Sequence, residues 1–424
     1  MTIKKIKLFL SLISFILVVQ VSYAQKQYAK TILDSLCSQN YAGRGYVKSG
    51  VEKSALFLED ELKKIGVKPY PNRAYQQKYS FGVNTFPYPI QVKLNQKELA
   101  IGKDYLVDAM SGSALGQFEV LEINTKNYLQ YQNILNEVGK IIVYNFTNLS
   151  NRDSILFFKK LAYQTIKYTP AVWVERNKMM YSVGRRAFKY PLIHIDEKAY
   201  YTPKTITLKI NNKYVPSYTS SNVVGYIPPK KDIFNLFKRD KYIVLSAHYD
   251  HLGQMGQAIF PGANDNASGV AMILSLAKYF IKNPVKYGVI LCLFSGEEAG
   301  LEGSKYFVSH PYFRLKKVKF VLNVDIMGGA SKGITVVNAT KYPKQFKLLT
   351  SINNENKYLN QVNKRGESAN SDHYFFSQVK VPAFFIYSVG DVKNYHDIND
   401  KAENTPLNNF NKVQKLLIDF INQL

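Results

Sequence analysis

Four near-continuous apolar runs stand out in the second half of the chain. They are Tyr242–Ser246, Val289–Phe294, Phe320–Val324 and Ala383–Tyr387. Runs of this kind are typical of strands that helices cover on both faces. Apolar residues also recur at helical spacing in two places: Val270, Ile273, Leu274, Ala277 and Ile281, and Phe410, Val413, Leu417, Phe420 and Leu424. The pattern predicts an α/β fold, a three-layer α/β/α sandwich with a mostly parallel central sheet.

The region before Ser221 is patterned differently. From Gly50 to Gly66 apolar residues recur at steps of three and four, which predicts an amphipathic helix with Gly66 as its C-cap. Residues 76–219 instead alternate short β-rich pieces with turns, and only the stretch around Ile155–Tyr163 has a helical pattern. The expected strands are Ile90–Leu94, Phe118–Ile123, Lys140–Tyr144, Ala171–Val174 and Thr205–Ile210. The β-rich region lacks a cluster of His, Cys, Asp or Glu, so it is a candidate second domain without catalytic groups.

The first 24 residues have the three-part form of a secretory signal. Three lysines precede an apolar run, Leu8–Val19, and small residues follow at Ser22-Tyr23-Ala24. The run is shorter than the roughly 20 residues that a membrane-spanning helix needs. We therefore expect residues 1–24 to be a signal peptide that is removed near Ala24, which leaves a secreted or periplasmic protein without a stable membrane anchor.

Composition adds limits on partners and on disulfides. The formal net charge is +25, but the basic residues are dispersed and no nucleic-acid-binding motif accompanies them. We interpret the charge as a basic, solvated surface and expect no nucleic-acid partner. The two cysteines, Cys37 and Cys292, are far apart in sequence, and Cys292 lies in an apolar run. Buried free thiols are therefore favoured over a structural disulfide.

Polar residues follow the predicted strands at the points where the strands end. His248 and Asp250 follow the first strand, Glu297 and Glu298 follow the second, and Asp325 follows the third. In open α/β sheets, ligands gather at the carboxyl ends of the strands, so these side chains should converge on one edge. Two further candidates lie in loops: Asp265, just before the helix that starts near Asn266, and His396, after the strand Ala383–Tyr387.

Such a set of carboxylates suggests bound metal. Several carboxylates without Lys or Arg partners repel one another, and a pair of divalent cations removes the conflict. The mixture of imidazole with carboxylate suits zinc better than calcium or magnesium. On chemical grounds, His248 supplies a nitrogen ligand and Asp250 accepts its other ring N–H, while Asp265 could bridge two metals. Of Glu297 and Glu298, one can bind metal while the other acts as a base.

The other histidines are left outside the expected ligand set. They are His194, His251, His310 and His373. His373, within the segment Ser371-Asp372-His373-Tyr374, is a candidate for lining the site.

Taken together, these segments resemble peptidase family 28, the exported dinuclear zinc aminopeptidases. The resemblance covers most of residues 26–75 and 220–424. The segments that carry it are Ala247–Gly253, Gly262–Gly269, Phe294–Gly300, Asn323–Gly328, Ser371-Asp372-His373 and Tyr395-His396. The resemblance implies one catalytic domain built from residues 25–75 and 220–424. It also implies that residues 76–219 are an inserted protease-associated-like domain that overhangs the cleft.

The resemblance also implies a role for each site residue. His248 and Asp325 would bind one zinc, Glu298 and His396 would bind the other, and Asp265 would bridge them. Glu297 would be the general base, and Asp250 would be the partner that orients His248. The implied activity is that of a hydrolase, a metallopeptidase that removes N-terminal residues from peptide substrates by means of a metal-bound water.

One segment departs from the family pattern, and three other functions stay open. Family members often continue the last histidine with Thr-Pro, whereas Asp397 and Ile398 follow His396 here. A single-zinc branch of the same fold performs glutaminyl cyclisation, although His251–Gly253 and Asn264–Gly269 favour the peptidase. A carboxypeptidase or dipeptidase could use the same metals. A non-enzymatic binding protein is the third alternative, but no ligand is missing. The side-chain preference and the oligomeric state are not indicated.

Overall fold

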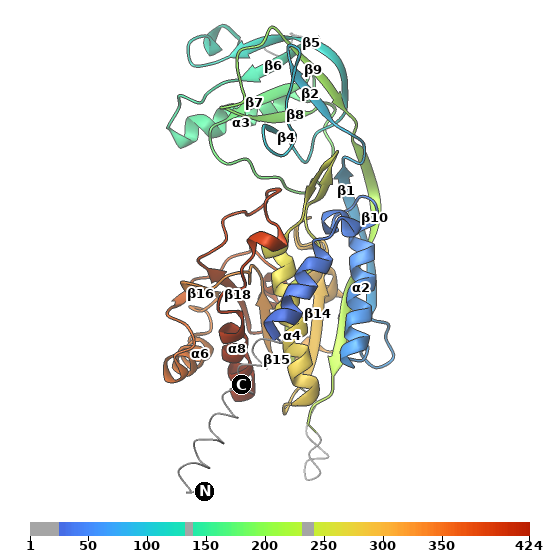
Figure 1. The fold of residues 1–424 in the computed structure, drawn as a ribbon, viewed down its shortest axis with the longest axis vertical. Coiled ribbons are helices and arrows are strands. Elements are labelled where there is room, and N and C mark those ends of the chain that lie inside the picture. Colours follow the sequence, from blue (N-terminus) through green and yellow to red (C-terminus); the bar gives the residue numbers. More distant parts are fainter. Residues whose placement is uncertain (1–24, 132–138, 231–240) are drawn as a thin grey trace, which may run out of the picture.

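The computed structural model describes residues 25–131, 139–230 and 241–424, and it divides into two lobes (Figure 1). Each lobe is built on an eight-stranded sheet. We call the lobe with the C-terminus the lower domain and the other lobe the upper domain, as they are drawn in Figure 1. The predicted signal peptide, residues 1–24, lies outside the described residues. Within the described ranges no helix is both long and apolar enough to cross a bilayer.

The lower domain is a mixed sheet between two helical layers. In spatial order its strands are β1 (Gln76–Thr85), β10 (Lys213–Ile227), β14 (Gly288–Phe294), β11 (Tyr242–His248), β15 (Val318–Val324), β18 (Ala383–Val389), β16 (Gly333–Val337) and β17 (Val362–Lys364). Its helices include α2 (Gly50–Ile65), α4 (Ser268–Lys282), α5 (Glu302–Ser309), α6 (Pro343–Asn356), α7 (His373–Gln378) and α8 (Phe410–Gln423), and residues 25–36 are helical as well. The four central strands, β14, β11, β15 and β18, run parallel.

Strand β11 shows why this sheet needs helices on both faces. Its side chains alternate between two cores: Ile243 and Leu245 pack toward α4, while Val244 packs toward α5 and α7 on the opposite face. All three residues are fully buried. The continuous apolar runs of the sequence therefore predicted the layered α/β fold correctly. The apolar residues at helical spacing likewise predicted α2, with Gly66 as its cap, and α8.

The upper domain is β-rich. In spatial order its strands are β3 (Lys97–Glu98), β2 (Gln91–Leu94), β9 (Thr205–Ile210), β5 (Ala114–Ile123), β6 (Lys140–Tyr144), β7 (Ala171–Glu175), β8 (Leu192–Asp196) and β4 (Tyr105–Val107). Its one long described helix is α3 (Arg152–Thr165), which packs on β6 and β7. Trp173, the single tryptophan of the chain, is buried beneath α3.

The two domains meet along a two-stranded ribbon, which corrects the boundaries expected for residues 76–219. Strands β1 and β10 pair with each other from Gln76↔Val223 to Thr85↔Lys213, and β10 also pairs with β14 in the lower sheet. Because both strands continue the hydrogen-bonded ladder of the lower sheet, the first and last residues of the expected insertion belong to that sheet. Only the segment between them forms the upper domain.

A hairpin of the lower domain reaches into the core of the upper domain. It consists of β12 (Gly253–Met255) and β13 (Ala258–Phe260), and its residues Met255 and Phe260 are buried among upper-domain side chains. The Gly256 N–H donates to the Phe86 carbonyl at 2.9 Å. The two lobes are therefore in direct apolar contact as well as joined by the ribbon.

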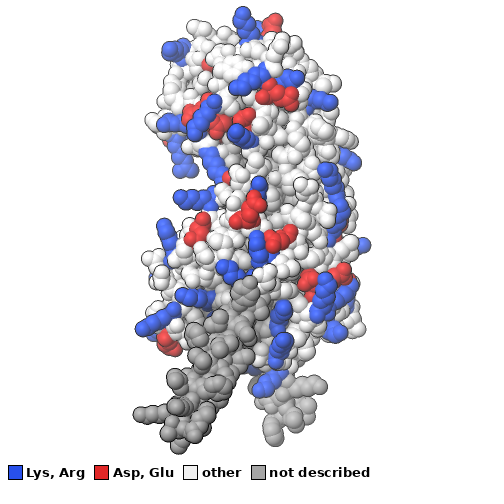
Figure 2. Space-filling view, viewed as in Figure 1, with Lys and Arg blue, Asp and Glu red and all other residues white. Residues whose placement is uncertain are grey.

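The dispersed charge and the free thiols agree with the sequence expectations on the face shown and in the described residues, except that Cys292 is buried while Cys37 is only partly buried. On the face shown in Figure 2, lysine and arginine side chains are scattered over both lobes with acidic side chains among them. Cys37 and Cys292 are both free thiols.

Candidate metal centre

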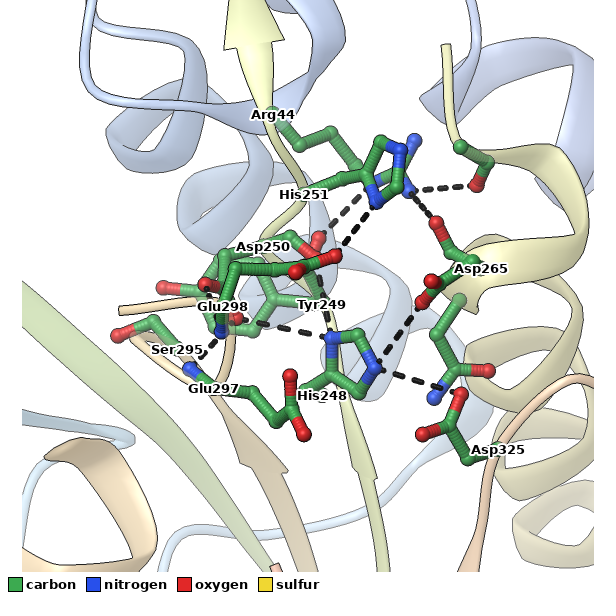
Figure 3. A network of polar contacts seen from close by, with 12 residues as sticks. Arg44, His248, Tyr249, Asp250, His251, Asp265, Ser295, Glu297, Glu298 and Asp325 are labelled. Carbon is green, nitrogen blue, oxygen red and sulfur yellow. Dashed lines mark hydrogen bonds and ion pairs between the residues drawn. The ribbon is translucent and has the colours of Figure 1, made fainter. Parts of the chain in front are cut away.

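The parallel strands deliver the predicted side chains to one edge of the lower sheet (Figure 3). His248 is the last residue of β11, Asp325 directly follows β15, and Glu297 follows β14 by three residues. The Asp325 N–H donates to the Ile386 carbonyl of β18 at 3.1 Å, which fixes where β15 ends. His248 and Asp325 are at most 6% exposed.

Asp265 reaches the same edge from the loop that precedes α4. The Asp400 carboxylate accepts the main-chain N–H groups of Asn264 at 2.8 Å and Asp265 at 3.0 Å, which holds the loop in place. Gly262 begins the turn with φ +62°, and a Cβ atom there would lie 2.4 Å from the ring of His251. The peptide bond between Asp265 and Asn266 is cis.

A first donor group forms around His248. Its Nε2 lies 3.3 Å from Asp265 Oδ1 and 3.3 Å from Asp325 Oδ1. Its Nδ1 lies 3.1 Å from the main-chain carbonyl of Asp250. A carbonyl oxygen only accepts, so Nδ1 carries the proton in the neutral ring and Nε2 presents a lone pair.

A second donor group forms around His396. Its Nε2 lies 3.2 Å from Asp265 Oδ2 and 3.3 Å from Glu298 Oε2. Its Nδ1 donates to the main-chain carbonyl of Tyr181 at 2.9 Å, which in the neutral ring again leaves Nε2 as the acceptor. The two oxygens of Asp265 therefore belong to different groups, one facing His248 and the other facing His396.

The donor set fits zinc. An Nε2 lone pair that faces carboxylate oxygens is unfavourable unless a cation or an added proton lies between them. In a tetrahedral zinc site with ligand bonds of about 2.0–2.1 Å, neighbouring donor atoms are about 3.3–3.4 Å apart. In both groups the histidine Nε2 lies 3.2–3.3 Å from each of its two carboxylate oxygens. Both groups also consist of imidazole and carboxylate, the ligands that zinc accepts.

Electrostatics at the site is set by burial and by crowding of carboxylates. Burial opposes the charged form of His396, but the carboxylates of Glu298 and Asp265 outweigh it and raise the pKa of His396 to about 11. Burial acts against the Glu298 carboxylate as well, yet the charge of His396 and the hydrogen bond from His251 lower the pKa of Glu298 to about 2. Both shifts arise from attraction between the His396 ring and the carboxylates around it, so this position favours a positive charge.

Glu297 lies beside the first donor group. One of its carboxylate oxygens is within 4.8 Å of donor atoms of His248 and Asp325. Burial, followed by the charges of Glu298, Asp372 and Asp325, raises the pKa of Glu297 well above its ordinary value. A carboxylate that prefers its protonated form, next to a site for a cation, is suited to accept a proton during a reaction.

The Asp250 carboxylate is placed differently from expectation. Its Oδ1 lies 3.7 Å from His248 Nδ1, whereas the Asp250 main-chain carbonyl is the nearer acceptor at 3.1 Å. The carboxylate instead accepts the main-chain N–H groups of Glu297 at 3.2 Å and Glu298 at 3.3 Å, and the Tyr46 hydroxyl at 2.7 Å. Asp250 therefore also fixes the turn that presents both glutamates, since three of its contacts are to groups other than His248.

His251, which the sequence left outside the ligand set, lies within the site. Its Nδ1 donates to Glu298 Oε1 at 2.8 Å, so the other oxygen of Glu298 is the one that faces His396. The ring is fully buried. Its position in the same strand-end loop as His248 is the one signal that could have identified it.

Two other residues that the sequence did not single out lie close by. Arg44 is fully buried, and its guanidinium donates to main-chain carbonyls, two of which belong to Gly262 and Asp265 (Figure 3). Asp372 is also fully buried, and burial raises its pKa to about 7. Among the remaining histidines, His373 is buried beside a cavity of about 200 Å³, His194 lies in the upper domain, and His310 follows α5.

Comparison with known proteins places the site in a family. Residues 222–421 match the model of peptidase family M28. Aminopeptidase YwaD of Bacillus subtilis is 27% identical over 289 residues, which are 65% of this chain and 56% of that protein. A probable zinc metalloprotease of Pyricularia oryzae is 36% identical over 114 residues, 26% of this chain and 22% of that protein. The match thus spans little more than half of the first relative and about a fifth of the second.

Solved structures share the whole fold. A zinc aminopeptidase from Bacillus subtilis superposes with a TM-score of 0.69 at 17% identity and covers 94% of both chains. A peptidase M28 precursor from Shewanella amazonensis superposes with a TM-score of 0.68 at 15% identity and covers 95% of this chain and 96% of that one. The part of the chain that holds every predicted site residue, residues 222–421, therefore belongs to peptidase family M28.

Proposed function

We propose that this protein is a dinuclear zinc aminopeptidase that hydrolyses the first peptide bond of peptide substrates. The observation that carries the proposal is that Asp265 belongs to both donor groups. One of its carboxylate oxygens faces the His248 Nε2 and the other faces the His396 Nε2, and each of these nitrogens also faces a second carboxylate. A site for one metal ion would not need two such groups that share a single carboxylate. The aminopeptidase activity in the name of the Bacillus relative supports the choice of reaction.

The proposed ligands are the members of the two donor groups. His248 and Asp325 would hold one zinc, Glu298 and His396 would hold the other, and Asp265 would bridge them. When bound, the zinc ions would acidify the attacking water and polarise the scissile carbonyl.

The remaining steps belong to side chains of the protein. Glu297 takes the proton of the attacking water on its carboxylate and later passes it to the leaving amine, so one group serves as base and then as acid. Asp250 holds the Glu297 main chain through its N–H, which keeps the carboxylate at the edge of the site. His251 holds one oxygen of Glu298 and keeps that residue from replacing Glu297 as the base.

The test combines zinc content with activity. Zinc per chain is measured by mass spectrometry, and hydrolysis is measured on a panel of aminoacyl fluorogenic substrates, with and without a chelator and with N-acetylated versions as blocked controls. We expect two zinc ions per chain, activity on free N-termini only, and loss of activity with the chelator. One tightly held zinc with glutaminyl cyclase activity, or hydrolysis of blocked substrates alone, would contradict the proposal.

A variant pair tests the base. Glu297→Gln should keep both zinc ions while kcat falls by about 10²–10⁴, because general-base catalysis contributes in that range. Glu355→Gln, at an exposed position of α6, is the matched control and should behave as the wild type. Wild-type turnover in Glu297→Gln would exclude Glu297 as the base.

A further inference from the structure

The loop that carries His396 belongs to the lower domain, but residues of the upper domain contact it and hold its conformation. His396 has a left-handed backbone, with φ +56°. Residues with a Cβ atom adopt this conformation only where the surroundings enforce it. The contacts that enforce it therefore decide where the imidazole points.

The nearest of these contacts form a reciprocal pair with Tyr181 of the upper domain. The Tyr181 N–H donates to the His396 carbonyl at 3.2 Å, and the His396 Nδ1–H donates to the Tyr181 carbonyl at 2.9 Å. The first bond fixes the main chain of His396, and the second fixes the ring and its tautomer. Both partners of His396 are main-chain atoms, so the pair depends on the path of the upper-domain segment rather than on its side chains.

Lys178 fastens the same segment to the loop. Its ammonium donates to the carbonyls of Lys393 and Tyr395, each at 3.1 Å, and pairs with Asp397 Oδ2 at 2.5 Å. The three acceptors lie on both sides of His396 in the sequence. The Lys178 ammonium therefore connects the parts of the loop before and after His396.

The segment that makes these contacts is itself anchored in the upper-domain core. Tyr181 is buried, and its ring lies 4.9 Å from the ring of Phe260 in the β12–β13 hairpin. Ile398, two residues after His396, packs against the same core. The upper core, the hairpin and the His396 loop thus form one packed unit.

We propose that the upper domain is a structural part of the metal centre, and that Lys178 is a positioning residue that keeps His396 in its ligand orientation. The inference rests on the proposed function, because it concerns the zinc that Glu298 and His396 would hold. The ring of His248, by contrast, is oriented by Asp250 of its own domain. Loss of the upper-domain contact should therefore weaken one zinc position and leave the other unchanged.

The experiment compares Lys178→Met with the wild-type full chain by competition with a zinc chelator. For Lys178→Met we expect one of the two zinc equivalents to bind about tenfold more weakly, the lower end of the effect of losing a group that orients a ligand. Lys178→Arg should restore binding, since it keeps the cation. Lys198→Met removes an exposed lysine of the same domain and should have no effect. The absorption spectrum of the cobalt-substituted protein should change for Lys178→Met only.

A second variant removes the lower-domain partner of the Lys178–Asp397 ion pair. Asp397→Asn should weaken the same zinc equivalent, and the double variant with Lys178→Met should cost less than the sum of the two single changes. Two zinc equivalents with wild-type affinity in both single variants would overturn the inference alone. Equal weakening of both equivalents would also overturn it, because it would indicate a general loss of structure. A wild-type chain that binds fewer than two equivalents would overturn the proposed function itself.

Discussion

Arg44 provides a strict test of how the metal centre is supported. Its side chain is fully buried, and its guanidinium donates to five main-chain carbonyls. The three shortest bonds reach Tyr249 at 2.8 Å, Pro261 at 2.5 Å and Gly262 at 2.6 Å. These carbonyls lie in the loops that carry His248 and Asp265, so one cation joins the two halves of the site.

The expected cost of Arg44→Met follows from these bonds. A hydrogen bond from a charged donor contributes about 1.5–3 kcal/mol, and a buried acceptor left without a donor costs a similar amount. Three short bonds give about 4–9 kcal/mol, and water entering the vacated space should reduce the loss to about 4–6 kcal/mol. Typical domains are stable by about 5–15 kcal/mol, so this is a large share of the total.

The assay is equilibrium unfolding in urea, followed by circular dichroism and by the fluorescence of Trp173. Trp173 is the single tryptophan and lies in the upper domain, so its signal separates upper-domain unfolding from that of the whole chain. Arg44→Lys keeps the charge but cannot reach all the carbonyls, and should lose about half as much free energy of unfolding. Arg314→Met, at an exposed position, is the control. A loss below about 1 kcal/mol in Arg44→Met would refute the reasoning.

Two further predictions concern charge. Asp265→Asn should reduce the zinc content from two ions per chain to one or fewer, because it removes the shared carboxylate; two retained ions would exclude bridging. In the upper domain, burial disfavours the Glu175 carboxylate, but hydrogen bonds from His194 and Lys159 lower its pKa to about 2 from the ordinary 4.5. The stabilisation is therefore present above about pH 4.5 and lost as the pH falls toward 2. Glu175→Gln should flatten this acid dependence of Trp173 fluorescence, and an unchanged profile would contradict the assignment.

The sequence predicted the elements and residues whose positions follow from regular geometry. Side chains at the ends of parallel strands must meet at one edge, so His248, Glu297 and Asp325 could be brought together from spacing alone. The place of Arg44 at the site could not be predicted in this way, because its hydrogen-bond partners are main-chain carbonyls, which every residue has. The contact between Tyr181 and His396 could not either, since it joins main-chain and ring atoms of two domains and depends on how those domains pack.

The boundaries of the second domain could not be predicted from the sequence pattern either. Strands β1 and β10 contain alternating residues that suit either sheet, and only the pairing of β1 with β10 and of β10 with β14 shows that they extend the lower one. Composition does not record these pairings, because they join segments that are far apart in the sequence, more than a hundred residues in the case of β1 and β10.

The β1–β10 ribbon makes the upper domain equivalent, in topology, to the turn of a hairpin. Thr85 and Lys213 are paired across the ribbon, so the chain leaves and returns within about 5.5 Å. A two-residue turn could close this gap and give a shortened protein with an intact lower sheet. The same geometry would accept a different domain in that place, provided that it covers the β12–β13 hairpin and replaces the contacts that Lys178 and Tyr181 make with the His396 loop. The ribbon is therefore a natural junction for exchanging the part of the protein that faces the metal centre from above.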